Sequence, residues 1–196
     1  MTTKSLEKRK YILACAERVF IREGFNKVTM KDIIDECKIS RGGLYLYFQS
    51  VDEIFMEVIR EHNEKKLEAI QCDVKMGYDF HKLIDEFFDN QKERLLNMNK
   101  SLITATFEFY LSHKKDFNKE FFFKQFYTSK EIILQILKFG VKPEKILDSS
   151  IELLAENIMF FLEGISTLAM SSDMTGELID AQFNFIKNMI YKNVSV

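Results

Sequence analysis

The sequence predicts an all-α protein of about nine helices. It contains one proline, seven glycines and no tryptophan, so few residues interrupt a helix. Apolar residues make up 46% of the 196 residues and recur at helical spacing, which allows a sizeable core to form. No long β-branched, turn-rich stretch indicates a sheet. We expect a three-helix N-terminal domain in residues 1–49 and a larger helical domain in residues 50–196.

The first predicted helix spans residues 5–22 and ends before Gly24, which suits a left-handed C-cap. Residues 29–48, TMKDIIDECKISRGGLYLYF, then predict two short helices joined by a tight turn. Thr29 is expected to N-cap the first of these, with Asp32 at the capping-box position. Ser40 is expected to cap the second, which should run from Arg41 to Phe48. This pattern predicts a helix-turn-helix, whose second helix enters the major groove of DNA.

The second helix of this motif has two distinct sides. Leu44 and Phe48 are four residues apart and should face the core. The opposite side carries Gly42, Gly43 and Leu46, flanked by Tyr45 and Tyr47. Two glycines in a short helix cost roughly 0.8–1 kcal/mol each relative to alanine, so we expect their backbone to approach a large partner closely. The ordinary alternative is a connector helix with a flexible glycine pair.

These positions suggest individual roles at a DNA surface. The tyrosine hydroxyls could reach phosphates, Leu46 could touch a thymine methyl group, and Arg41 could bond a phosphate or a guanine edge. The predicted DNA-binding residues are Thr29, Lys31, Ser40, Arg41, Gly42, Gly43, Tyr45, Leu46, Tyr47 and Ser50.

Charge is distributed unevenly along the chain. The net charge is only −2, but residues 1–50 contain ten Lys and Arg against six Asp and Glu. Residues 51–196 contain 18 against 24. A basic head on an acidic body indicates nucleic-acid binding that weakens with salt. The basic residues Lys4, Lys8, Arg9 and Lys10 could also contact a phosphate or the minor groove, or could simply be a solvated terminus.

The N-terminal pattern resembles the DNA-binding domain of TetR-family transcriptional repressors. The resemblance rests on Glu23-Gly24-Phe25, Thr29, Ile39-Ser40 and the run Gly42 to Phe48, and it covers about a quarter of the chain. Two positions depart from the family pattern. Lys38 stands where a turn glycine is usual, so we expect it in a left-handed conformation. Val51 stands where lysine is common, so one phosphate contact of the family is expected to be missing.

The remaining residues predict a helical body. A helix capped by Ser50, with Glu53 completing a capping box, should run to Cys72 with Ile54, Phe55, Val58 and Ile59 inward. A turn over residues 73–79 follows, and then helices over 80–98, from Ser101 to His113, and on to residue 139. The inward residues of helix 80–98 are expected to be Leu83, Ile84, Phe87, Phe88, Leu95 and Leu96. Gly140 and Pro143 should close this block, before two final helices over 148–170 and 177–193.

Nine aromatic residues lie among positions 107–127, including Phe117. Such a cluster could line an apolar pocket, although aromatic stripes at helical spacing are also ordinary core packing. TetR relatives bind effectors in the body, and this resemblance favours a pocket. The predicted ligand-binding residues are Phe88, Phe107, Tyr110, Phe122, Phe126, Asn157, Phe160 and Phe161. The expected ligand is a small apolar or aromatic molecule.

Helix 148–170 is apolar around more than half of its circumference. Its narrow polar stripe consists of Glu152, Glu156, Glu163 and Thr167. A helix of this kind needs covering from more than one direction, and a second subunit is a plausible cover. The resemblance implies the same, because the last two helices form the homodimer in TetR relatives. A two-fold dimer predicts a near-palindromic double-stranded operator.

No catalytic site is recognisable in the sequence. His62, His81 and His113 are scattered, and three distant cysteines make neither a metal motif nor a disulfide framework, so we expect no enzyme activity, metal or cofactor. Helical projection predicts that Glu108 and Glu163 lie on solvated faces. The charged N-terminus contains no apolar signal segment, and the apolar runs are too short for a membrane span. A reducing cytoplasm is therefore expected.

These observations predict a DNA-binding transcriptional regulator, a repressor that leaves its operator when a small molecule binds the C-terminal domain. The alternative is a helical small-molecule-binding protein with a vestigial DNA-binding head. An enzyme is the third possibility, and only measured turnover would support it.

Overall fold

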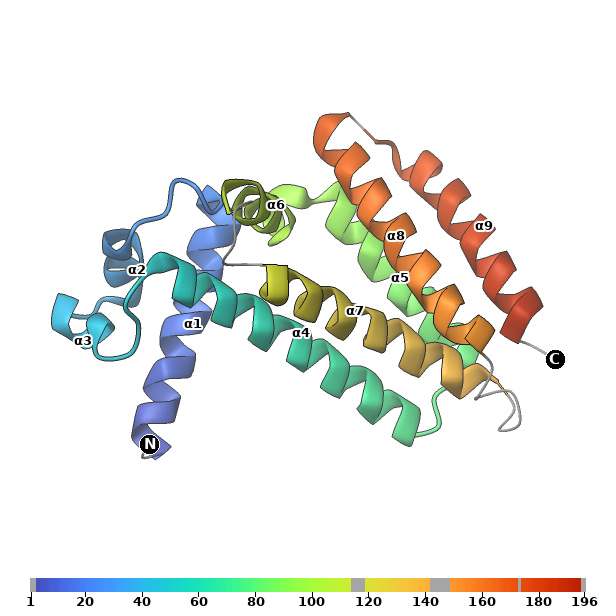
Figure 1. Ribbon diagram of the computed structural model, residues 1–196, viewed down its shortest axis with the longest axis horizontal. Helices are drawn as coiled ribbons and strands as arrows, with labels where there is room; N and C mark the ends of the chain where they lie inside the picture. Colours follow the sequence, from blue (N-terminus) through green and yellow to red (C-terminus); the bar gives the residue numbers. More distant parts are fainter. Residues whose placement is uncertain (1–2, 114–118, 142–148, 173, 195–196) are drawn as a thin grey trace. The chain divides into compact units, whose positions relative to one another are not determined.

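The computed structural model describes residues 3–113, 119–141, 149–172 and 174–194. Within these ranges the chain forms nine α-helices, one short 3-10 helix and no strand (Figure 1). The helices are α1 (Thr3–Glu23), α2 (Met30–Cys37), α3 (Arg41–Tyr45), α4 (Val51–Lys75), α5 (Phe80–Leu96), η1 (Met98–Lys100), α6 (Ile103–Ser112), α7 (Lys119–Gly140), α8 (Ser149–Ser171) and α9 (Gly176–Val194). The all-α prediction is confirmed.

Two compact units divide the chain. The first unit comprises Met1–His62 and Met98–Phe122, and the second comprises Asn63–Asn97 and Phe123–Val196. The first unit therefore includes α6, which lies far along the sequence from the three N-terminal helices.

Aromatic side chains form the centre of the first unit. Phe20 of α1 meets Phe55 of α4 edge to face, with ring centroids 4.8 Å apart. Phe109 of α6 lies 4.9 Å from Phe55 and 4.9 Å from Phe25. All four rings are buried, as are Leu44 and Phe48. Part of the aromatic run in residues 107–127 thus packs into the core beneath the helix-turn-helix.

Glu108 ties α6 to the turn after α1. Its carboxylate accepts hydrogen bonds from the backbone N–H groups of Phe25, at 2.6 Å, and Asn26, at 2.9 Å. Gly24 has a φ of +80°, and a Cβ built on it would lie only 2.6 Å from the same carboxylate. The predicted solvated face for Glu108 is therefore wrong, because the backbone N–H groups of Phe25 and Asn26 lie in the turn after α1 and find their acceptor in the carboxylate of a distant helix.

The second unit is a helical body built from α5, α8, α9 and the parts of α4 and α7 that belong to it. Its core residues include Leu83, Phe88, Ile136, Ile158 and Phe183. Two ion pairs join α5 to α9, one between Lys92 and Asp180 at 2.6 Å and one between Lys187 and Asp85 at 2.8 Å.

One described segment, Ser150–Ser171, is long and apolar enough to cross a membrane by length and composition, with a mean hydropathy of 1.4. A single such segment is weak evidence, because a helix in a protein core passes the same test. Glu152, Glu156 and Glu163 lie within it.

Several predicted boundaries need correction. The second helix of the motif ends at Tyr45, and Leu46 and Tyr47 form a turn. Helix α4 continues three residues beyond Cys72, and α5 ends at Leu96, which is exposed rather than inward. Leu102 occupies the N-cap position of α6 and makes no side-chain cap bond, but the Ser101 hydroxyl oxygen accepts from the N–H of Ile103 at 3.4 Å, so Ser101 still helps to cap this helix.

Other predicted features are confirmed or lie outside the described residues. The inward residues of α4 are all buried, and α7 ends at Gly140 as expected. Ser50 caps α4 by accepting from the N–H of Glu53, but the Glu53 carboxylate accepts from Gln49 rather than Ser50, so the predicted capping box is incomplete. Phe117, Pro143 and the predicted helix start at Asp148 lie outside the described residues.

Candidate nucleic-acid interface

The start of α2 is fixed by its N-cap. The N–H of Asp32 is donated to the Thr29 hydroxyl oxygen at 3.4 Å, and the Asp32 carboxylate accepts from the Thr29 N–H at 2.8 Å. The Thr29 hydroxyl also donates to that carboxylate at 2.6 Å. These bonds hold the pKa of Asp32 below its usual range, the hydroxyl contributing most. The predicted capping box is present.

The turn between α2 and α3 contains the expected left-handed residue. Lys38 has a φ of 52° and ψ of 43°, a conformation that is costly for a residue with a side chain. Ser40 then begins α3, and its hydroxyl oxygen accepts from the N–H of Gly43 at 3.1 Å. Both caps orient α3 relative to α2. The Ser40 cap was predicted from residue type and spacing, whereas the left-handed Lys38 was predicted from the resemblance to TetR-family proteins.

Helix α3 presents one buried and one open side. Leu44 is fully buried, whereas Leu46, just after the helix, is 82% exposed. The Leu46 side chain therefore adds little to the core and is open to an external partner. The Arg41 guanidinium lies over the Tyr45 ring, 5.5 Å from its centroid, which keeps the cation at the edge of the same side.

Gly42 and Gly43 have different surroundings. A Cβ built on Gly42 would meet nothing within 4 Å, so packing within this chain does not require a glycine there. A Cβ on Gly43 would lie 3.1 Å from the Ser40 hydroxyl oxygen that caps the helix. Contacts within the chain thus explain why a glycine stands at position 43, whereas none in the described residues explains the glycine at position 42.

The predicted DNA-binding residues come from the starts of α2 and α4, from α3 and from the turn after α3. Those exposed are Thr29, Lys31, Ser40, Arg41, Gly42, Leu46 and Ser50. Those half-buried are Gly43, Tyr45 and Tyr47. Val51, in place of the usual lysine, packs against the core of the first unit. The hydroxyls of Thr29, Ser40 and Ser50 already serve as caps.

The basic residues of the head fall into two groups. Three arginines of α1 are used internally: Arg9 pairs with Glu57 at 2.5 Å, Arg18 with Glu36 at 3.0 Å and Arg22 with Glu23 at 3.0 Å. The others make no ion pair with any described residue, namely Lys4, Lys8, Lys10, Lys27, Lys31, Lys38 and Arg41. Their charge is available to an external anion.

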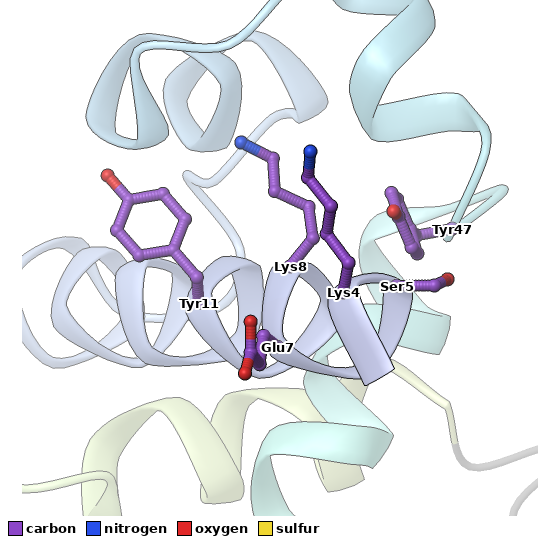
Figure 2. A pocket seen from close by; sticks show the side chains of 6 residues that line it. All are labelled: Lys4, Ser5, Glu7, Lys8, Tyr11 and Tyr47. Atoms are coloured by element: carbon purple, nitrogen blue, oxygen red, sulfur yellow. The ribbon is translucent and has the colours of Figure 1, made fainter. Parts of the chain in front are cut away.

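An open groove joins the start of α1 to the end of the helix-turn-helix. Its lining residues are Lys4, Ser5, Glu7, Lys8, Tyr11 and Tyr47. Figure 2 shows Lys4 and Lys8 extending from the same side of α1, with Tyr11 and Tyr47 beyond them at the two ends. The Lys8 amine lies 5.3 Å from the centroid of the Tyr11 ring, and the Tyr11 hydroxyl donates to the Cys37 carbonyl at 3.2 Å. The lysines can be identified from the sequence as possible phosphate contacts, but their place beside Tyr47 cannot, because it depends on how α1 packs against the helix-turn-helix.

The predicted ligand-binding residues are divided between the two units. Phe107, Tyr110 and Phe122 belong to the first unit, where the Tyr110 and Phe122 rings meet edge to face at 4.9 Å. Phe88, Phe126, Asn157, Phe160 and Phe161 belong to the second unit. Phe88 is buried against Phe183, and Asn157 is exposed, with its amide donating to Leu153 of its own helix at 2.8 Å.

A helix-turn-helix with an open, cationic recognition side defines a DNA-binding protein, and comparison with known proteins gives the family. The model for bacterial regulatory proteins of the tetR family matches residues 12–58, and the model for the tetracyclin repressor-like C-terminal domain matches residues 83–179. The chain belongs to the TetR family and is a transcriptional regulator with a DNA-binding domain.

Individual proteins similar to this chain are also transcriptional regulators or share its fold. The regulator YfiR of Bacillus subtilis is 28% identical over 143 residues, which cover 72% of this chain and 69% of YfiR. The regulator QacR of Staphylococcus aureus is 32% identical over 66 residues, which cover 31% of this chain and 35% of QacR. A candidate fatty acid metabolism regulator from Clostridium perfringens is 26% identical, with a TM-score of 0.61 over 91% of this chain and 97% of that one. Reduced NemR of Escherichia coli shares the fold, with a TM-score of 0.70 at 14% identity, covering 92% and 96%.

Proposed function

We propose that this regulator is a repressor that binds a near-palindromic operator as a homodimer and leaves it when a small, largely apolar molecule binds the C-terminal region. The observation that carries the DNA-binding part is the open side of α3, where Gly42 has no neighbour and Leu46 is exposed. DNA-binding function is assigned to residues 1–49, and effector binding and dimerisation to residues 50–196.

The protein would make two kinds of contact with the operator, one with base edges and one with phosphates. Leu46 and Arg41 would read base edges in the major groove, because an apolar side chain recognises a thymine methyl group and a guanidinium recognises guanine. The unpaired lysines, with the hydroxyls of Tyr45 and Tyr47, would contact phosphates and set the register. Lys4 and Lys8 in the groove beside Tyr47 would extend this phosphate contact along the DNA backbone.

The homodimer would form through α8 and α9. Both helices carry large apolar side chains on their exposed sides, namely Leu153, Phe160 and Leu168 on α8 and Leu178 and Phe185 on α9. Spacings of seven and eight residues place them along one side of each helix. Exposed apolar stripes of this size favour burial against another protein surface, and a two-fold axis would pair each stripe with its copy.

An effector would act by shifting the population between two conformations. A ligand that binds one conformation more tightly draws the protein toward it, and release follows if that conformation spaces the recognition helices wrongly for the operator. The aromatic side chains of the body, including Phe88 and Phe183 at a ring separation of 5.0 Å, support an apolar ligand. The kinship with a candidate fatty acid metabolism regulator is consistent with that character.

The test is selection of bound duplexes from a random DNA pool, with the wild-type protein and with Leu46→Ala. The wild type should select one near-palindromic sequence, whose half-sites lie about one helical turn, or a multiple of it, apart. Leu46→Ala should bind with similar overall strength but lose preference at one position in each half-site, at a cost of about 1–3 kcal/mol there. Selection of no sequence by the wild type, or a uniform loss across all sequences in the variant, would contradict base reading by this side chain.

A further inference from the structure

A polar cluster interrupts the apolar body of the second unit. Arg94 and Gln91 lie one turn apart on α5, and Glu163 lies near the middle of α8. The Arg94 guanidinium donates to the Gln91 amide oxygen at 2.7 Å. Among the described residues this is its only hydrogen bond, and Glu163 acts on it electrostatically without reaching ion-pair distance. A guanidinium has five N–H donors, so most of them have no protein partner in the described chain.

Burial shifts the pKa values of Arg94 and Glu163 more than the attraction between their charges does. Burial lowers the pKa of Arg94, although the charge of Glu163 works in the opposite direction. Burial likewise raises the pKa of Glu163, although Arg94 opposes the shift. Glu163 is nevertheless exposed and Arg94 half-buried, so solvent and small solutes can reach both groups. The attraction between two charges does not offset their desolvation here, which leaves the cluster incomplete.

We propose that Arg94 is the anchor for the carboxylate of the effector, and that the effector is an apolar organic acid. This inference rests on the proposed effector-binding function and specifies the chemical class of the ligand. The fork of N–H donors on a guanidinium matches the two oxygens of a carboxylate, and such bidentate pairs are among the strongest hydrogen-bonded contacts in proteins. The apolar part of the acid would contact buried neighbours such as Leu95 of α5 and Met159 of α8.

The cluster adapts to an anion better than to a cation. Arginine stays protonated in proteins, so Arg94 cannot remove its charge to admit a cationic ligand. Glu163 can take up a proton when a second carboxylate arrives, because burial has already moved its pKa upward. Protonated Glu163 would then become a hydrogen-bond donor beside the bound acid instead of a repelling charge.

The experiment compares three probes with the same ten-carbon chain: decanoate, decanol and decyltrimethylammonium. Calorimetry on the full-length protein without DNA measures their affinities. Decanoate should bind roughly ten- to a hundredfold more tightly than decanol, as expected for hydrogen bonds to a charged group. Arg94→Gln should reduce that ratio to about one, and Arg94→Lys should give an intermediate value because a single ammonium lacks the fork.

Controls separate this result from misfolding and from failure of the regulator itself. Lys82→Gln removes the same charge from an exposed position on α5 and should keep the decanoate preference. Arg94→Gln combined with Glu163→Gln avoids leaving the Glu163 carboxylate without its opposite charge, and thermal melting checks that both variants fold. Equal binding of decanoate and decanol, stronger binding of the ammonium probe, or no binding of any probe would overturn the proposal. Operator binding measured on the same samples shows whether the regulator function survives such a result.

Discussion

At the scale of single residues, the proposed DNA interface depends on the two glycines of α3 and on the caps beside them. Gly42 and Gly43 are adjacent, yet only Gly43 sits against another group, the capping hydroxyl of Ser40. The sequence pattern predicted the same role for both glycines, because a helical projection does not show which atoms would surround a side chain at each position. The local pattern did predict both N-caps, since these depend on chemistry within a few residues, whereas the left-handed Lys38 was predicted only from the family resemblance.

Alanine substitutions at the two glycines should therefore have different effects. Gly42→Ala should leave the free energy of unfolding unchanged or raise it by up to about 1 kcal/mol, because alanine favours helix and meets no neighbour. Gly43→Ala should be less stable than Gly42→Ala by about 0.5–2 kcal/mol, because it disturbs the cap. Denaturant unfolding measures both.

Gly42→Ala should weaken operator binding even though it does not destabilise the fold. A methyl group there would hold the DNA backbone or base edges away from α3, so we expect Gly42→Ala to bind the operator at least about tenfold more weakly, roughly 1.4 kcal/mol. An equally stable or more stable variant with unchanged operator affinity would remove the reason for proposing a close approach.

At the level of elements, the sequence predicted helix positions that depend on neighbouring residues, but it did not predict contacts between helices that are distant in the sequence. Caps and spacing gave the helices to within a few residues. The role of α6 was missed, because its carboxylate Glu108 bonds to N–H groups more than 80 positions earlier. Neither residue alone signals this contact. The only available hint was the short Gly-Phe turn after α1, because its backbone N–H groups need an acceptor from outside the turn.

The apolar stripes of α8 and α9 yield a test of the dimer. Phe160→Glu and Phe185→Glu place a charge on side chains that are 62% and 68% exposed in the single chain. Either should give monomers in sedimentation experiments and weaken operator binding roughly a hundredfold or more, because two linked half-site contacts become separate. Leu111→Glu, at an exposed leucine of α6, should leave the dimer intact. Dimeric Phe160→Glu and Phe185→Glu would place the interface elsewhere.

Across the whole molecule, the sequence predicted the class of protein better than its ligand. The basic head, the acidic body and the helix-turn-helix pattern are read directly from residue types, and the family comparisons confirm the regulator they indicate. The aromatic run suggested a pocket, but its residues belong to two units, Phe109 lies in the core of the first unit, and Tyr110 and Phe121 pack against that core. Core packing and ligand binding use the same aromatic side chains, so composition cannot separate them. The domain boundary after residue 49 and the individual site residues remain predictions.

The most direct test of the central claim is a fluorescence anisotropy titration of the protein against the DNA flanking its own gene, with unrelated DNA as control, at several salt concentrations. We predict tight binding to one near-palindromic site by two subunits, at least about a thousandfold stronger than to unrelated DNA and weaker as salt increases. Weak binding that is equal on both DNAs and disappears with salt would contradict the claim, because it would show a basic helical head that does not read sequence.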